Sequence, residues 1–138
     1  MEGDFEFLDH TADVGIIAYG ADTKQAFANA ARGLFSLITK LDDINENLYR
    51  DIEVTATDEA GLLVDWLNEL IYQFDTDNVL FRRFDIIEFG YCRLKARAYG
   101  EKVNSSRHRL KTGVKAATYH LLEISQGGGG RVQVLFDI

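Results

Sequence analysis

The sequence predicts an α+β fold, a single domain over residues 1–138 with two amphipathic helices packed on one face of a mainly antiparallel sheet. Its regular segments follow the order β-β-α-β-α-β-β-β-β, so the strands gather late and do not alternate with helices. The 138 residues suit one domain, and neither an internal repeat nor a linker is visible. Glycines 127–130 are typical of a hairpin loop within that domain.

Two segments have the hydrophobic spacing of helices that bury one face. Asp22 stands three residues before Gln25, a pattern typical of a helix start, and Asp58 is the expected cap of the second helix. The first helix should bury Phe27, Ala30, Ala31, Leu34 and Ile38. The second should bury Leu63, Trp66, Leu67, Leu70, Ile71 and Phe74, with Asp65, Glu69 and Tyr72 on the opposite side.

The remaining regular segments read as strands because apolar and polar residues alternate or β-branched residues dominate. Between the helices, the predicted strand begins at Ile52 and follows a polar, irregular stretch at 41–50. A hairpin is expected around Gly90. The other predicted strands are at 5–7, 14–19, 116–124 and 131–136, together with the two arms of that hairpin within 79–99.

Composition excludes several classes of function. The formal net charge is −7 and the pI is about 4.9, which opposes direct nucleic-acid binding because phosphate contacts need Lys and Arg. No apolar run approaches the roughly 20 residues that span a bilayer, and the acidic N-terminus is no signal peptide, so we expect a soluble cytoplasmic protein. The single cysteine, Cys92, excludes an intrachain disulfide and is expected to be buried.

Oxygen-bearing side chains stand near both ends of the chain. Asp13 follows Asp9 and His10 in a polar turn, and the sequence finishes with Asp137 and Ile138 directly after a predicted strand. If the two ends meet, the two Asp side chains and the terminal carboxylate form a cluster that Ca²⁺ or Mg²⁺ favours. The alternative is equally open: turn residues that bond the backbone, a packed histidine and a solvated terminus.

The basic side chains concentrate late in the sequence. This group suits either a solvated loop or a surface for a phosphate or an acidic partner, and it comprises Lys102, Arg107, His108, Arg109, Lys111, Lys115 and His120. Asp65 and Glu69 are one helical turn apart on an exposed face, so they are solvated or face a partner. No nucleophile-base arrangement, zinc pair or dinucleotide glycine pattern is present.

Four segments in order resemble the archease family over the whole chain: 10–15 (HTADVG), 63–72 (LVDWLNELIY), 114–120 (VKAATYH) and 136–138 (FDI). The resemblance implies a metal site, usually calcium with Mg²⁺ or Mn²⁺ as alternatives, held by Asp13, Asp137 and Ile138. It also implies a non-enzymatic activator of the GTP-dependent RNA ligase of the RtcB type, which associates with tRNA only through that ligase. Tentative contacts to the partner or nucleotide are His10, Lys115, His120, Asp65 and Glu69.

The resemblance has one departure, and two other functions stay open. Family members often carry an acidic residue shortly before the histidine that matches His108, whereas residues 104–107 here are Asn-Ser-Ser-Arg. One rival is a metal-dependent phosphoesterase that uses Asp13, His10 and Asp137. The other is a general protein chaperone or tRNA-modification adaptor whose metal is purely structural.

Overall fold

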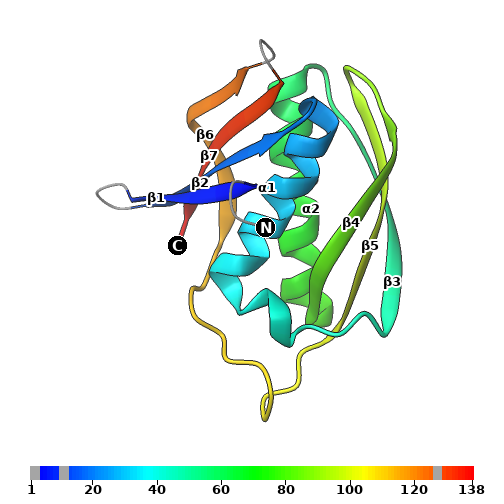
Figure 1. The fold of residues 1–138 in the computed structure, drawn as a ribbon, viewed down its shortest axis with the longest axis vertical. Helices are drawn as coiled ribbons and strands as arrows, with labels where there is room; N and C mark the ends of the chain where they lie inside the picture. The colour runs from blue at the N-terminus through cyan, green and yellow to red at the C-terminus, as the bar shows by residue number, and fades with distance from the viewer. Residues whose placement is uncertain (1–3, 10–12, 126–128) are drawn as a thin grey trace.

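Two antiparallel sheets enclose two helices in the computed structural model, which describes residues 4–9, 13–125 and 129–138 (Figure 1). The α+β class and the predicted order of elements are confirmed. The strands divide between a four-stranded and a three-stranded sheet, whereas the sequence pattern had predicted one. Helix α1 (Thr23–Ile38) contacts both sheets, so the helices form a layer between them.

The four-stranded sheet joins the two ends of the chain. Its strands are β1 (Phe5–Asp9), β2 (Val14–Gly20), β7 (Gly130–Asp137) and β6 (Ala116–Ser125), in that spatial order. Side chains at alternate positions of β2 and β7 face the helices and are fully buried, among them Ile16, Val134 and Phe136. This alternation fixes the pairing register, because a one-residue slip would turn these side chains to the outer face.

The three-stranded sheet consists of β3 (Leu48–Thr55), β5 (Arg93–Lys102) and β4 (Val79–Phe89), in that order. The predicted hairpin around Gly90 is confirmed. Strand β3 begins at Leu48, four residues earlier than predicted, because residues 48–51 also pair with β5. Cys92 is exposed, not buried as expected, since it lies in the hairpin turn and its thiol contacts the carbonyl oxygen of Thr57 at 3.6 Å.

Both helices start where the sequence predicts. The side chain of Asp22 accepts the backbone N–H of Gln25 at 2.8 Å, and Asp58 accepts that of Gly61 at 2.7 Å. Helix α2 (Glu59–Asp77) ends at Asn78, whose backbone is in the left-handed region with φ 56°. No helix in the described ranges is long and apolar enough to cross a membrane.

The core lies between the helices and the inner faces of the two sheets. All the apolar residues predicted for the first helix are buried, and the predicted stripe of the second is buried except for Phe74, which is partly exposed. Trp66 is fully buried, and its indole N–H donates to the carbonyl oxygen of Phe27 at 3.0 Å. This bond ties α2 to α1 while satisfying the one polar atom of the largest core side chain.

A buried carboxylate fixes the long segment between β5 and β6. Glu101 accepts Arg107 at 2.7 Å and the backbone N–H of Asn45 at 2.7 Å, and its side chain is only 5% exposed. The short 3₁₀ helix η1 (Leu41–Asp43) is held there too, because Arg107 also donates to the carbonyl oxygen of Asp43 at 2.7 Å. Arg107, one of the predicted basic group, therefore has a structural role and is not part of a solvated loop.

The ring of His108 completes this cluster in its neutral form. Its Nδ1 accepts the backbone N–H of Asn104 at 2.8 Å, so the proton is on Nε2. Nε2 lies 2.9 Å from Glu101 Oε2 and 3.0 Å from the carbonyl oxygen of Asp43, both acceptors. Since His108 is buried and both ring nitrogens are used, it is a structural residue here.

Candidate metal centre at one end of the four-stranded sheet

The register of the four-stranded sheet brings the two ends of the chain together. Val14 pairs with Phe136, and Asp13 directly precedes this pair on the β2 side while Asp137 directly follows it on β7. In an antiparallel pair of strands, the residue before a paired position on one strand and the residue after it on the other lie at the same end of the ladder. The large separation in sequence gave no indication of this arrangement, in which the register puts Asp13 and Asp137 at the same end of the sheet.

Strand β6 adds a basic residue to the same end of the sheet. Ala116 pairs with Asp137, and the backbone N–H of Lys115 donates to the carbonyl oxygen of Asp137 at 2.8 Å. Lys115 therefore lies next to Ile138. Lys115, Asp137 and Ile138 are all exposed, so this end of the sheet can meet a partner.

The site has a rigid base although its side chains are exposed. Strand β7 lies between β2 and β6, and Phe136, directly before Asp137, is fully buried in the core. A central strand anchored by a buried phenyl ring does not fray as a free terminus does. Asp137 and Ile138 are thus presented from a fixed backbone.

An edge-capping asparagine supports the first residues of β6. The side chain of Asn68 on α2 accepts the backbone N–H of Ala117 at 2.7 Å and donates to its carbonyl oxygen at 3.5 Å. It thereby pairs backbone groups that face away from β7 at the edge of the sheet. No role was predicted for Asn68, because it stands beside Glu69 and one helical turn after Asp65, where a polar side chain is expected to face solvent.

Replacing Asn68 with Ala should lower the free energy of unfolding by about 1 kcal/mol, because the Ala117 N–H loses its acceptor. Exchange of the Ala117 amide hydrogen should also become faster than in the wild type. Chemical denaturation and hydrogen exchange measure the two effects. Asp75→Ala, at an exposed position of the same helix, is the control and should change stability by less than about 0.5 kcal/mol. Unchanged exchange at Ala117 in Asn68→Ala would rule out the capping role.

The donor set suits a hard divalent cation. Two carboxylates at adjacent positions repel each other, and a bound cation relieves that repulsion. Carboxylate and main-chain oxygens are the ligands that Ca²⁺ and Mg²⁺ prefer. In the part of the chain that the structure describes, no group of three or more His, Cys, Asp and Glu side chains is arranged to hold an ion. A metal centre here would consist of the two Asp side chains and an oxygen of Ile138. Water or a partner would occupy the remaining coordination positions of the cation.

Comparison with known proteins agrees with the resemblance drawn from the sequence. The model of the archease protein family (MTH1598/TM1083) matches residues 5–138. The chain belongs to the archease family. The protein archease of Methanosarcina mazei is 39% identical over 139 residues, covering 97% of this chain and 95% of its own. The protein archease of Sulfolobus acidocaldarius is 43% identical over 126 residues, covering 91% of each chain.

Solved archease structures share the fold. The solution structure of protein 1598 from Methanobacterium thermoautotrophicum superposes with a TM-score of 0.84 at 35% identity, covering 99% of both chains. The crystal structure of an archease from Thermotoga maritima, described as a possible chaperone, gives a TM-score of 0.67 at 21% identity, covering 95% of this chain and 94% of its own. The second likeness is at the level of the fold alone.

The other predicted contact residues of this archease are distributed over different elements. His10 lies outside the described residues. His120 is exposed on β6, within a stretch where the pairing register shifts between Thr118 and Glu123, so it is not at the sheet end. Asp65 and Glu69 line a shallow cavity of about 340 Å³ between α2 and β3. The register therefore places Asp13, Asp137, Ile138 and Lys115 at one end of the four-stranded sheet, whereas Asp65 and Glu69 are on helix α2.

Proposed function

We propose that this archease is a non-enzymatic, chaperone-like activator of a GTP-dependent RNA ligase of the RtcB type in the cytoplasm. It promotes guanylylation and repeated turnover of that ligase. Family membership supports the proposal, and so does the juxtaposition of Asp13 and Asp137 at an exposed, rigid end of the sheet. In this proposal the protein reaches tRNA only through the ligase, as its net charge of −7 favours.

Each residue of the sheet end has a distinct task in this proposal. Asp13, Asp137 and an oxygen of Ile138 hold a divalent cation, calcium by preference. When bound, the cation supplies positive charge that offsets the negative charge developing during nucleotidyl transfer. Lys115, directly before the neighbouring strand β6, provides a mobile point charge for a phosphate group. The sheet end thereby stabilises a conformation of the ligase that is rarely populated alone.

A single-turnover guanylylation assay of the cognate ligase tests the proposal. Wild-type protein should accelerate guanylylation, while Asp13→Ala and Asp137→Ala should lose that effect and retain the fold. Asp75→Ala, an exposed aspartate on α2, is the matched control and should activate fully. Full activation by both sheet-end variants would contradict the proposal.

A general chaperone role is the second candidate, because the Thermotoga structure is described as that of a possible chaperone. This role predicts that the protein suppresses aggregation of unrelated clients, and that the Asp13 and Asp137 variants do so as well as the wild type. Phosphoester turnover by the purified protein alone would instead indicate the metal-dependent hydrolase.

A further inference from the structure

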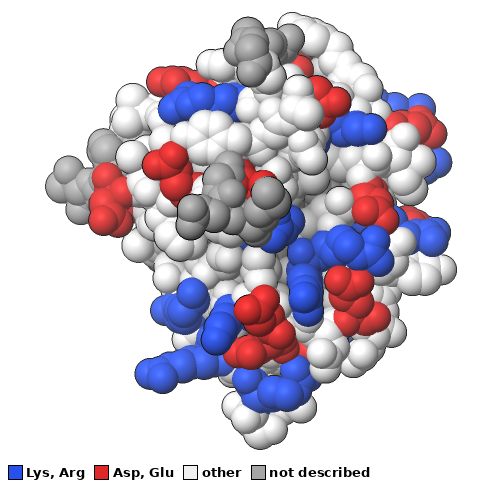
Figure 2. Space-filling model, viewed as in Figure 1, with Lys and Arg blue, Asp and Glu red and all other residues white. Residues whose placement is uncertain are grey.

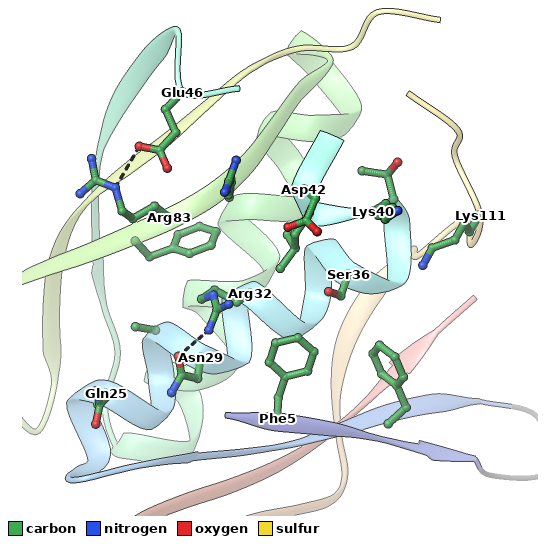
Figure 3. A pocket seen from close by; sticks show the side chains of 16 residues that line it. Phe5, Gln25, Asn29, Arg32, Ser36, Lys40, Asp42, Glu46, Arg83 and Lys111 are labelled. Carbon is green, nitrogen blue, oxygen red and sulfur yellow. Dashed lines mark hydrogen bonds and ion pairs between the residues drawn. The ribbon is translucent and has the colours of Figure 1, made fainter. Parts of the chain in front are cut away.

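A polar cleft with a lining distinct from the metal centre lies between the two sheets. It has a volume of about 730 Å³, within the range of small-molecule sites. Helix α1 forms its floor, β1 and β4 form its walls, and η1 and the segment before β6 close one end (Figure 3). None of the residues assigned to the metal centre lines this cleft.

The charge of the cleft is opposite to that of the whole chain. Asp42 and Glu46 are its acidic side chains, and its cationic side chains are Arg32, Lys40, Arg82, Arg83 and Lys111. Figure 2 shows basic side chains gathered over the lower half of this face, with acidic ones between them. Because the chain carries −7 overall, a local excess of cations lined by low-dielectric walls creates a specific attraction for anions.

Two of these cations are available to a ligand. Arg32 is paired with Asp4 at 2.7 Å and Arg83 with Glu46 at 3.0 Å. Within the described residues, Lys40 and Lys111 form no ion pair, and both are exposed. A ligand that binds these ammonium groups has no existing salt bridge to break.

The fold holds the two lysines together from segments 71 positions apart in the chain. The backbone N–H of Lys111 donates to the carbonyl oxygen of Ile38 at 2.7 Å, and the hydroxyl of Thr39 donates to the carbonyl oxygen of Arg109 at 2.7 Å. The segment before β6 is thus fastened to the end of α1, directly before Lys40. Figure 3 shows Lys40 and Lys111 at the same end of the cleft, with Asp42 beside them.

Aromatic rings form the wall opposite β4. Phe5 and Phe7 project from β1 with their centroids 5.9 Å apart, and Phe7 is 52% exposed. An exposed phenyl ring beside a cationic cleft offers a stacking surface for a flat ligand, as in proteins that bind nucleobases. A phosphate site alone would not use this apolar surface.

We propose that this cleft binds a mononucleotide. Its phosphates contact Lys40 and Lys111, and its base lies against the ring of Phe7. Asp42 is the unfavourable neighbour, because its carboxylate reduces the positive potential where the phosphates bind. The proposal is independent of the metal centre and of the ligase.

Isothermal titration with ATP, inorganic triphosphate and adenosine tests the proposal, in EDTA and at low ionic strength so that no cation at the sheet end contributes. ATP should bind more tightly than triphosphate, and adenosine most weakly. Lys40→Ala and Lys111→Ala should each weaken ATP binding about tenfold or more, because a charge-assisted contact is lost. Phe7→Ala should weaken ATP binding and leave triphosphate unchanged, and Asp42→Asn should tighten both.

Lys95→Ala, on the central strand β5 of the three-stranded sheet and outside the lining of the cleft, is the control and should bind ATP as the wild type does. Circular dichroism of each variant verifies folding, which these positions should not alter because none of them is buried in the core. Absence of ATP binding by the wild type, or an equal loss in Lys95→Ala, would overturn the proposal. Tighter binding of a single-stranded hexauridylate than of ATP would also overturn it and indicate an RNA surface.

Discussion

Replacing Glu101 with Ala should lower the free energy of unfolding by about 3–5 kcal/mol, a large part of the stability of a domain this size. The carboxylate is almost fully buried and accepts Arg107, the Asn45 N–H and the His108 ring. Its removal leaves these donors without an acceptor and releases η1 and the segment after β5. Urea denaturation measures the change.

The same carboxylate should make stability depend on pH in the acid range. Burial alone raises the pKa of Glu101, and hydrogen bonds from Arg107, Asn45 and His108 outweigh burial, so the pKa falls from 4.5 to about 2. A lowered pKa stabilises the folded state above the unfolded value, and that contribution is lost as pH falls from about 4.5 to 2. It amounts to roughly 3 kcal/mol.

Two variants separate the charge of Glu101 from its packing. Glu101→Gln keeps the shape and loses the titrating group, so its stability should vary much less than that of the wild type between pH 4.5 and 2. Glu53→Ala removes an exposed carboxylate paired with Arg93 at 2.7 Å and should cost less than about 1 kcal/mol. A Glu101→Ala protein as stable as Glu53→Ala would show that the buried cluster contributes little.

Local patterns were enough to predict the elements of this fold. The caps at Asp22 and Asp58 and the apolar stripe around Trp66 depend on residues within one or two helical turns, which is why the sequence alone located both helices. The division into two sheets depends on which strand edges meet. Pairing of Val14 with Phe136 spans almost the whole chain, and no local spacing encodes it.

The residues of the candidate site could be predicted from the sequence, but their placement relative to one another could not. Asp13 and Asp137 were recognisable from residue type and resemblance, while their adjacency follows from the register of β2 on β7. The role of His108 could not be predicted, because its acceptor Glu101 belongs to the preceding strand and is buried only in the folded chain. The cleft above α1 likewise collects lysines from separate segments.

Asp137→Asn should change stability in opposite directions with and without calcium. In EDTA the variant should be as stable as the wild type or slightly more stable, because one of two adjacent like charges is gone. With calcium at about 100 times its dissociation constant, the wild type should gain about 2.7 kcal/mol of unfolding free energy, and the variant much less. Thermal unfolding with and without calcium measures both differences.

The reversal of order is the decisive feature of that experiment, because a structural role for Asp137 cannot produce it. If the substitution merely disturbs β7, the variant is less stable than the wild type both with and without calcium. If Asp137 binds no cation, calcium changes the stability of the two proteins by the same amount. Repeating the thermal unfolding with magnesium in place of calcium tests which ion the site prefers. If the site provides six to eight flexible oxygen ligands, calcium should stabilise the protein far more than magnesium does.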